Sequence, residues 1–155
     1  MNHKLLVAVD GEKSSAKTAI YVGRSCAGSA GAENRVVLFH VLPALPPWIE
    51  SGESANADSQ RGKYLAEVTE AGERMLAEMM EFILREGVPA SCVTAELCDE
   101  EGNIADLILD AARRHECDTI VVGRRGKSMV GQYFGGGVAE RLLRHPIGFT
   151  IWLVE

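Results

Sequence analysis

The sequence predicts an α/β protein built on a parallel β-sheet. Apolar, β-branched segments alternate along the chain with segments whose apolar residues recur every three or four positions, as β-α-β units require. The segment Thr119–Val122 contains no charged residue, which is typical of a strand buried on both faces. At 155 residues, with 46% hydrophobic and 25% charged residues, the chain is expected to fold as one domain, 1–155.

These patterns predict strands alternating with helices. We expect strands at 4–10, 36–42, within 91–97, from 119 and at 149–154. The first helix follows with Ser14 or Ser15 as its cap, the second runs from Leu65 to about Gly87, the third opens at Gly102 and the last covers 137–144. Buried stripes are expected on the first helix (Ala16, Ala19, Ile20, Gly23, Cys26, Ala27) and on the third (Ile104, Leu107, Ile108, Ala111, Ala112).

The segment between the second strand and the long helix has no steady period. Residues 43–60 are rich in Pro, Ser, Gly, Glu and Asn around a lone Trp48, and we predict a long surface loop there. A loop of this length in a compact domain is often functional or disordered.

Charge and composition argue against several classes of function. The net charge is −6, whereas non-specific nucleic-acid binding requires a basic surface, so we expect no nucleic-acid partner. No apolar run approaches the ~20 residues of a membrane span, and Met1–Lys4 leads directly into a strand, so we expect a cytoplasmic protein with no membrane partner. Cys26, Cys92, Cys98 and Cys117 show no CxxC spacing and are expected to be reduced thiols in or near the core.

Glycines gather after the strand that begins at Thr119. Gly123 and Gly126 follow it directly, and Gly136–Gly137 come after nine further residues. Backbone without Cβ lets an anion approach main-chain N–H groups, which indicates a phosphate-binding segment; a tight turn that serves packing alone is the alternative. A P-loop would need glycine at Val121, and a dinucleotide fingerprint would have to follow the first strand, where Asp10–Lys13 stands instead, so both motifs are rejected.

Several segments together resemble the universal stress protein family, in its single-domain UspA form. They are the first-strand ending Val7–Gly11, the second-strand ending His40–Val41, the segment from Gly102–Asp106 to Asp118–Gly123, and the glycine spacing. Nucleotide-binding members carry G-x-x-G, nine residues, then G and Ser or Thr. Gly123, Gly126 and Gly136 fall at the three glycine positions, and the resemblance spans essentially the whole chain.

The resemblance implies an open parallel sheet of order 3-2-1-4-5 with helices on both faces, Rossmann-like and of the adenine nucleotide alpha hydrolase-like type. It also implies an ATP or AMP site, with or without Mg²⁺, in the crevice where the first and fourth strands part, where ligands of such sheets generally bind. Asp10 would lie by the ribose and adenine, with a turn cap as its alternative role. The implied nucleotide-binding residues are Ala8, Val9, Asp10, Val41, Val122, Gly123, Arg125, Gly126, Gly136, Gly137 and Val138.

One position departs from the family pattern. Gly137 stands where nucleotide-binding members have Ser or Thr. A hydroxyl there would donate a hydrogen bond to a charged oxygen, which contributes ~1.5–3 kcal/mol, up to about a hundredfold in affinity. Lys127 or Ser128 could compensate from the other side. Two functions therefore stay open: an adenine-nucleotide-binding stress-response regulator, and a nucleotide-free interaction module that acts through protein partners.

No catalytic or metal-binding residues are expected. The histidines, His3, His40, His115 and His145, show neither metal-ligand spacing nor a Ser/His/Asp arrangement. His40 is expected to point away from the side of Val41 and to pack in the core, and Glu140 to complement the N-terminus of the last helix. If ATP is hydrolysed, we expect slow turnover from a site built for binding.

The last strand suggests self-association. Ile151–Val154 is apolar on both faces, and an exposed edge of this kind invites pairing with another chain. In the family resembled, this edge commonly pairs with its copy in a second subunit, so we expect a homodimer. The alternative is a strand covered by its own helices.

Overall fold

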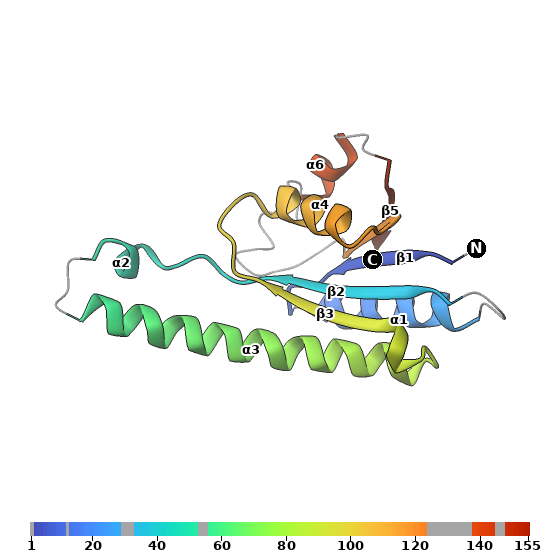
Figure 1. The fold of residues 1–155 in the computed structure, drawn as a ribbon, viewed down its shortest axis with the longest axis horizontal. Helices are drawn as coiled ribbons and strands as arrows, with labels where there is room; N and C mark the ends of the chain where they lie inside the picture. Colours follow the sequence, from blue (N-terminus) through green and yellow to red (C-terminus); the bar gives the residue numbers. More distant parts are fainter. Residues whose placement is uncertain (1, 12, 29–32, 53–55, 124–137, 145–147) are drawn as a thin grey trace.

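The computed structural model describes residues 2–11, 13–28, 33–52, 56–123, 138–144 and 148–155. Its five strands form one parallel sheet of order β3-β2-β1-β4-β5, which confirms the class and strand order expected from the sequence (Figure 1). The strands are β1 Lys4–Ala8, β2 Arg35–Val41, β3 Val93–Cys98, β4 Thr119–Gly123 and β5 Thr150–Val154.

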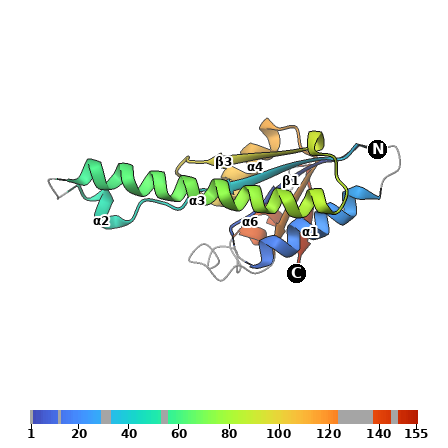
Figure 2. The same ribbon diagram turned by 90° about the horizontal axis from the view of Figure 1, so that it is seen from below.

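Helices cover both faces of this sheet. α1 (Lys13–Ala27) and α3 (Ala57–Arg85) lie on one face, whereas α4 (Ile104–Arg114) and α6 (Val138–Arg144) lie on the other (Figures 1 and 2). This division follows from the handedness of parallel crossovers, which are almost always right-handed. The chain moves from β1 to β3 in one direction across the sheet and from β3 through β4 to β5 in the other, so the two sets of crossover helices take opposite faces.

The central strands separate two hydrophobic cores. Side chains alternate along β1, so that Leu5 and Val7 face α1 and α3 while Leu6 and Ala8 face α4 and α6. Residues 120–122 of β4 are fully buried. An unbroken apolar strand is what two-sided burial requires, and the strands at the centre of the sheet are therefore the ones that the sequence pattern identified most plainly.

The segment 43–60 differs from the loop expected there. It contains a short helix, α2 (Pro47–Glu50), and its last four residues already belong to α3, which begins at Ala57. Proline is favoured in the first turn of a helix because its missing N–H has no partner to lose there. Ile49 packs inward at 4% exposure, while neighbouring Trp48 is 65% exposed. The first residues of α3 are mostly polar and show no helical repeat of apolar residues. The sequence pattern therefore placed the start of this helix too late, at Leu65.

Details of α1 also differ from expectation. Neither Ser14 nor Ser15 precedes the helix, because α1 already includes Lys13. Ala19, Gly23 and Cys26 are buried as expected, but Val22 is buried and Ala27 is exposed. On α4, Ile108, Ala111 and Ala112 are buried as expected, and Ala105 and Leu109 are buried in addition.

The four cysteines are buried and unpaired, as expected. Burial raises the pKa of Cys117 to about 11 and also raises the pKa of Cys26, so these thiols stay protonated at neutral pH. In the segments that the structure describes, no helix has the length and apolarity needed to cross a membrane.

Candidate functional site

A small hollow lies at the carboxyl ends of β1 and β2, beside the start of α4. Its volume is about 20 Å³, and its lining residues are Ala8, Val9, Asp10, Phe39, His40, Val41, Ile104 and Ile108. The first three and Val41 are residues that the sequence resemblance implied. In a sheet of order 3-2-1-4-5 the connections leave β1 and β4 toward opposite faces, so the hollow adjoins the position where ligands of such sheets bind.

Asp10 is held in a tight turn between β1 and α1. The hydroxyl of Ser15 donates a hydrogen bond to Asp10 Oδ1 at 2.8 Å and accepts one from the Asp10 backbone N–H at 3.1 Å. The next residue, Gly11, has φ of +84°, a conformation that residues with a Cβ rarely adopt. The structure thus gives Asp10 the turn-stabilising role, and the same contacts fix its carboxylate at the mouth of the hollow.

His40 is positioned by β1 and by α3. Its Nδ1 lies 2.8 Å from the carbonyl oxygen of Val9, a geometry in which Nδ1–H donates and the oxygen accepts. Above it, a Cβ added at Gly72 of α3 would lie 3.3 Å from His40 Cδ2. Val41 packs instead in the core under α4, so the predicted alternation of these two residues is confirmed. Burial lowers the pKa of His40, and the imidazole is therefore neutral at pH 7 although it is only half-buried.

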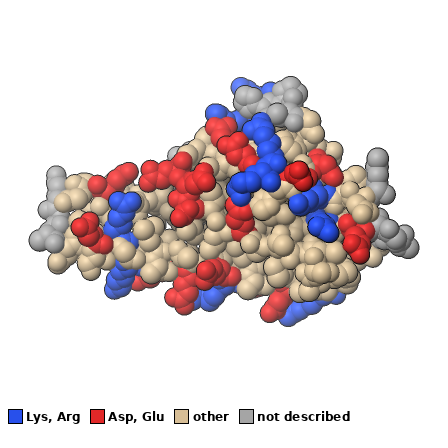
Figure 3. Space-filling view, in the orientation of Figure 1, with Lys and Arg blue, Asp and Glu red and all other residues tan. Residues whose placement is uncertain are grey.

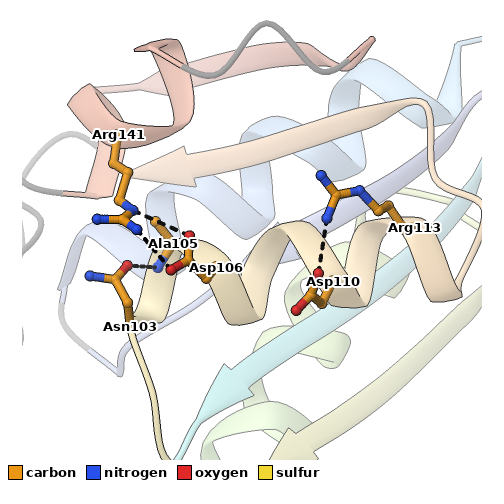
Figure 4. Close-up of polar contacts among 6 residues, drawn as sticks. All are labelled: Asn103, Ala105, Asp106, Asp110, Arg113 and Arg141. Carbon is orange, nitrogen blue, oxygen red and sulfur yellow. Dashed lines mark hydrogen bonds and ion pairs between the residues drawn. The ribbon is translucent and has the colours of Figure 1, made fainter.

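The N-terminus of α4 forms the wall of the hollow opposite the strands. Asn103 caps this helix, because its Oδ1 accepts a hydrogen bond from the Ala105 backbone N–H at 3.0 Å (Figure 4). Asp106 in the first turn accepts two hydrogen bonds from Arg141 of α6, at 3.2 and 2.9 Å. This bidentate pair joins the two helices of this face.

The remaining predicted site residues come from β4 and the segment after it. Val122 lies beside Ala8 in the register of β1 and β4, and Gly123 ends β4 against the first turn of α1. A Cβ at Gly123 would lie 3.3 Å from Thr18 Oγ1, so the absence of a side chain lets β4 and α1 approach. Val138 is buried and begins α6. Arg125, Gly126, Gly136 and Gly137 lie outside the described residues.

Sequence reasoning missed part of the lining. Phe39, Ile104 and Ile108 also line the hollow, and the sequence analysis assigned them only to a strand or to the buried face of a helix. Their positions carried a usable signal, since Phe39 precedes the end of β2 and Ile104 opens the helix that follows β3. Apolar residues next to the carboxyl ends of parallel strands border the ligand crevice of such a sheet as well as the core.

The charge around this end of the sheet is acidic in the described part of the chain. Asp99, Glu100 and Glu101 follow β3 and are exposed, and acidic side chains gather there around the connection between β3 and α4 (Figure 3). Lys and Arg side chains gather over α4 and α6. Glu140 lies in the first turn of α6, as expected, and pairs with Arg144. Within the described ranges, no three His, Cys, Asp or Glu side chains are grouped so that they could hold a metal ion.

Comparison with known proteins supports one family. A model of the Universal stress protein family matches residues 1–146. A universal stress protein family member from Burkholderia pseudomallei has the same fold, with a TM-score of 0.64 at 22% identity over 97% of this chain and 94% of that one. No curated protein matches the chain significantly.

Two further solved structures with this fold contain a nucleotide. A universal stress protein from Archaeoglobus fulgidus, in complex with dAMP, has a TM-score of 0.61 and 17% identity over 99% of this chain and 98% of that one. A universal stress protein in complex with cAMP has a TM-score of 0.62 and 16% identity over 99% of this chain and 96% of that one. At these identities the likeness establishes the fold alone.

Proposed function

The chain belongs to the universal stress protein family, and from this premise we propose that it binds an adenine nucleotide, ATP or AMP, at the carboxyl ends of β1 and β4 and acts as a stress-response regulator. The observation that carries the proposal is the convergence of Asp10, Val9 and Val41 on one hollow at this end of the sheet. Val9 and Asp10 directly follow β1 and Val41 ends β2, and the sequence resemblance implied each of them.

The chemistry of the hollow suits a base and a ribose. Its walls are apolar, and an adenine ring stacked between Ile104 and the end of β1 would replace water against Ala8 and Val41. The Asp10 carboxylate accepts hydrogen bonds only, so it matches the hydroxyl donors of a ribose. With a volume of about 20 Å³, the hollow would contact only the edge of the base. The phosphates would extend toward Gly123 and the start of α6.

The relatives support the adenine preference. Two proteins of this fold form complexes with dAMP and cAMP. We propose that the same base is recognised here and that the glycine spacing 123, 126 and 136 supplies main-chain N–H groups for the phosphates. Mg²⁺ would then arrive with the nucleotide and would neutralise part of the phosphate charge.

Isothermal titration with ATP and with AMP, each with and without Mg²⁺, tests the proposal. Asp10→Asn should weaken binding by about tenfold or more, because the ribose hydroxyl would donate to a neutral amide oxygen instead of a charged carboxylate. Asp58→Asn is the matched control, since Asp58 is an exposed residue in the first turn of α3 and does not line the hollow. Absence of heat with either nucleotide at high micromolar protein would refute nucleotide binding.

Replacing Gly137 probes the family's missing hydroxyl. Gly137→Ser should raise ATP affinity by up to about a hundredfold, because the added hydroxyl donates to a phosphate oxygen. Gly135→Ser is the control for the effect of removing a glycine from the same segment. Equal affinities for the wild type and both variants would mean that the geometry of this segment, and not the missing hydroxyl, differs from that of nucleotide-binding members.

We also propose that the protein forms a homodimer through β5. Ile151–Val154 lies at one edge of the sheet, and Leu153 is 48% exposed. Leu153→Lys should convert the dimer to a monomer in light scattering coupled to gel filtration, because a charge replaces an apolar contact. Leu143→Lys is the control, since Leu143 on α6 is 65% exposed. A monomeric wild type would contradict the proposal.

A further inference from the structure

A second, larger hollow lies at the opposite end of the sheet. Its volume is about 350 Å³, and it opens on the face of α4, where Thr94 of β3 is exposed. Its lining includes Lys4, Arg35, Val37, Thr94, Glu96 and His115. Pockets of 300–1,000 Å³ are the usual size for small-molecule ligands, so this hollow is large enough for one.

Two cations stand side by side on one wall of the hollow. Lys4 and Arg35 are register partners on β1 and β2, and both lie on the face of α4 because Leu5 and Val36 belong to the other core. Neither side chain makes a hydrogen bond or ion pair with another residue that the structure describes. Like charges directly opposite on neighbouring strands repel each other and destabilise a sheet. A bound anion would remove this repulsion between Lys4 and Arg35.

Among the described residues of the lining, the one carboxylate, that of Glu96, is already paired. Glu96 on β3 accepts two hydrogen bonds from Arg114, at 3.0 and 2.8 Å, and its second oxygen also contacts His115 Nε2. The hydrogen bond from Arg114 is the main cause of the lowered pKa of Glu96. Because these partners hold Glu96, its charge is not available to Lys4 and Arg35. With Lys4 and Arg35 against the single carboxylate of Glu96, the described lining carries a net positive charge in a chain whose net charge is −6.

We propose that this hollow binds a phosphate-bearing small molecule, with the phosphate between Lys4 and Arg35. A phosphate dianion matches two adjacent cations, and the planar guanidinium of Arg35 offers paired donors that fit its oxygens. The volume exceeds the need of inorganic phosphate, so an organic remainder fills the space along Val37 and Thr94. Lys4 and Asp10 are six residues apart along extended chain, about 20 Å, so this site is separate from the proposed nucleotide site.

Amide chemical shifts of the ¹⁵N-labelled full chain test the proposal. Inorganic phosphate and glycerol 3-phosphate are titrated separately at low ionic strength, with glycerol as the uncharged control. We expect saturable shifts at Arg35, Thr94 and His115 with the phosphates and none with glycerol. Tighter binding of glycerol 3-phosphate identifies a phosphate monoester as the ligand, and equal binding identifies free phosphate.

Charge-removing variants then assign the cations. Arg35→Gln and Lys4→Gln should each weaken binding by about tenfold or more. Arg61→Gln and Lys63→Gln, on the exposed surface of α3, are the matched controls and should bind as the wild type does. The same spectra report whether each variant is folded, and Arg35→Lys should retain part of the affinity. Absence of saturation at millimolar phosphate, shifts confined to Val9, Asp10 and Val41, or equal losses in the control variants would overturn the proposal.

Discussion

The two ends of the sheet differ in how their hollows are built. At the carboxyl end the hollow is small, and core residues such as Phe39 and Ile108 wall it. At the amino end the hollow is much larger, and charged residues such as Arg35 and Glu96 wall it. Size alone would choose the amino end as the ligand site. The sheet topology and the family pattern instead indicate a ligand site at the carboxyl end. Loops leave the strands there, and the fold holds the strand ends in fixed positions.

The two ends of the sheet also differ in the sign of their charge. The described residues around the carboxyl end are acidic, and the basic Arg124, Arg125 and Lys127 belong to the segment outside the described residues. The amino end carries two cations without partners in the described structure. A nucleotide at the carboxyl end would therefore depend on main-chain N–H groups and on the basic segment for its phosphates, whereas an anion at the amino end would meet preformed cations.

The largest expected effect tests the difference in packing between the two ends. Phe39→Ala should lower the free energy of unfolding by about 3–5 kcal/mol, because Phe39 is 1% exposed and its loss leaves a cavity under the carboxyl-end hollow. Thr94→Ala, in the amino-end hollow, should change it by less than about 0.5 kcal/mol, because Thr94 is exposed. Urea denaturation measures both. Similar losses in the two variants would contradict the contrast.

Two glycines in α3, Gly62 and Gly72, differ in how tightly their surroundings pack against them. A Cβ at Gly72 would lie 2.8 Å from Leu97 Cδ2 and 3.3 Å from His40 Cδ2, whereas nothing lies within 4 Å of one at Gly62. Gly62→Ala should raise the free energy of unfolding by about 0.5–1 kcal/mol through helix propensity. Gly72→Ala should be about 1–3 kcal/mol less stable than Gly62→Ala because of overpacking. Thermal denaturation of both variants would show the difference, and equal stabilities would mean that α3 lies farther from the sheet.

The two ends should also lose stability in separate pH windows. Burial lowers the pKa of His40 below its ordinary value of 6.5, so on acidification the unfolded chain takes up a proton that the folded chain does not. The free energy of unfolding therefore falls as pH drops below 6.5. Glu96 has its pKa lowered from 4.5, chiefly by Arg114, so its stabilisation is present above that pH and is lost below it.

The urea concentration at the midpoint of unfolding, determined at a series of pH values from neutral to acidic, measures these two losses of stability. His40→Gln should reduce the pH dependence of the free energy of unfolding below pH 6.5 that is due to His40, and should leave the dependence due to Glu96 unchanged. Glu96→Gln should do the reverse. A His40→Gln variant with an unchanged slope between neutral pH and the ordinary pKa of glutamate would show that His40 is not held neutral by the fold.

The smallest effect concerns the acidic rim of the carboxyl end. Neutralising Asp99, Glu100 and Glu101 together as Asn, Gln and Gln should raise ATP affinity without Mg²⁺ by at most about fivefold, because exposed charges interact by less than about 1 kcal/mol. Titration calorimetry with Mg²⁺ present should show a smaller change, since the metal already screens the phosphates. The same substitution made at Glu67, Glu70 and Glu73 on α3 is the control, and an equal gain there would indicate a non-specific charge effect.

The sequence was sufficient for the parts of the fold that depend on local pattern. Strands such as residues 119–122 are buried on both faces, so an apolar run was an unambiguous signal. The start of α3 was wrong because polar residues at a helix end carry no apolar period, and α2 was missed because four residues are too few to show one. The Ala27 error on α1 has the opposite origin, since the pattern of small residues continues to the end of the helix, where Ala27 is exposed.

The candidate site was only partly accessible from the sequence. Asp10 and Val41 were found through the resemblance, and the structure brings them to one hollow. The contact between His40 and Gly72 joins residues far apart in the chain, and so does the pairing of Glu96 with Arg114 and His115. No local pattern encodes such contacts, because they depend on how the helices are seated on the sheet.

A titration of AMP into the ¹⁵N-labelled protein, followed by amide chemical shifts, tests nucleotide binding at the carboxyl end most directly. The shifts should saturate and should be largest at Val9, Asp10, Val41 and Gly123, with Arg35 and Thr94 unmoved, because the base would occupy the hollow at the carboxyl end. Shifts confined to the residues of the amino end, or no saturable shifts at all, would contradict the account.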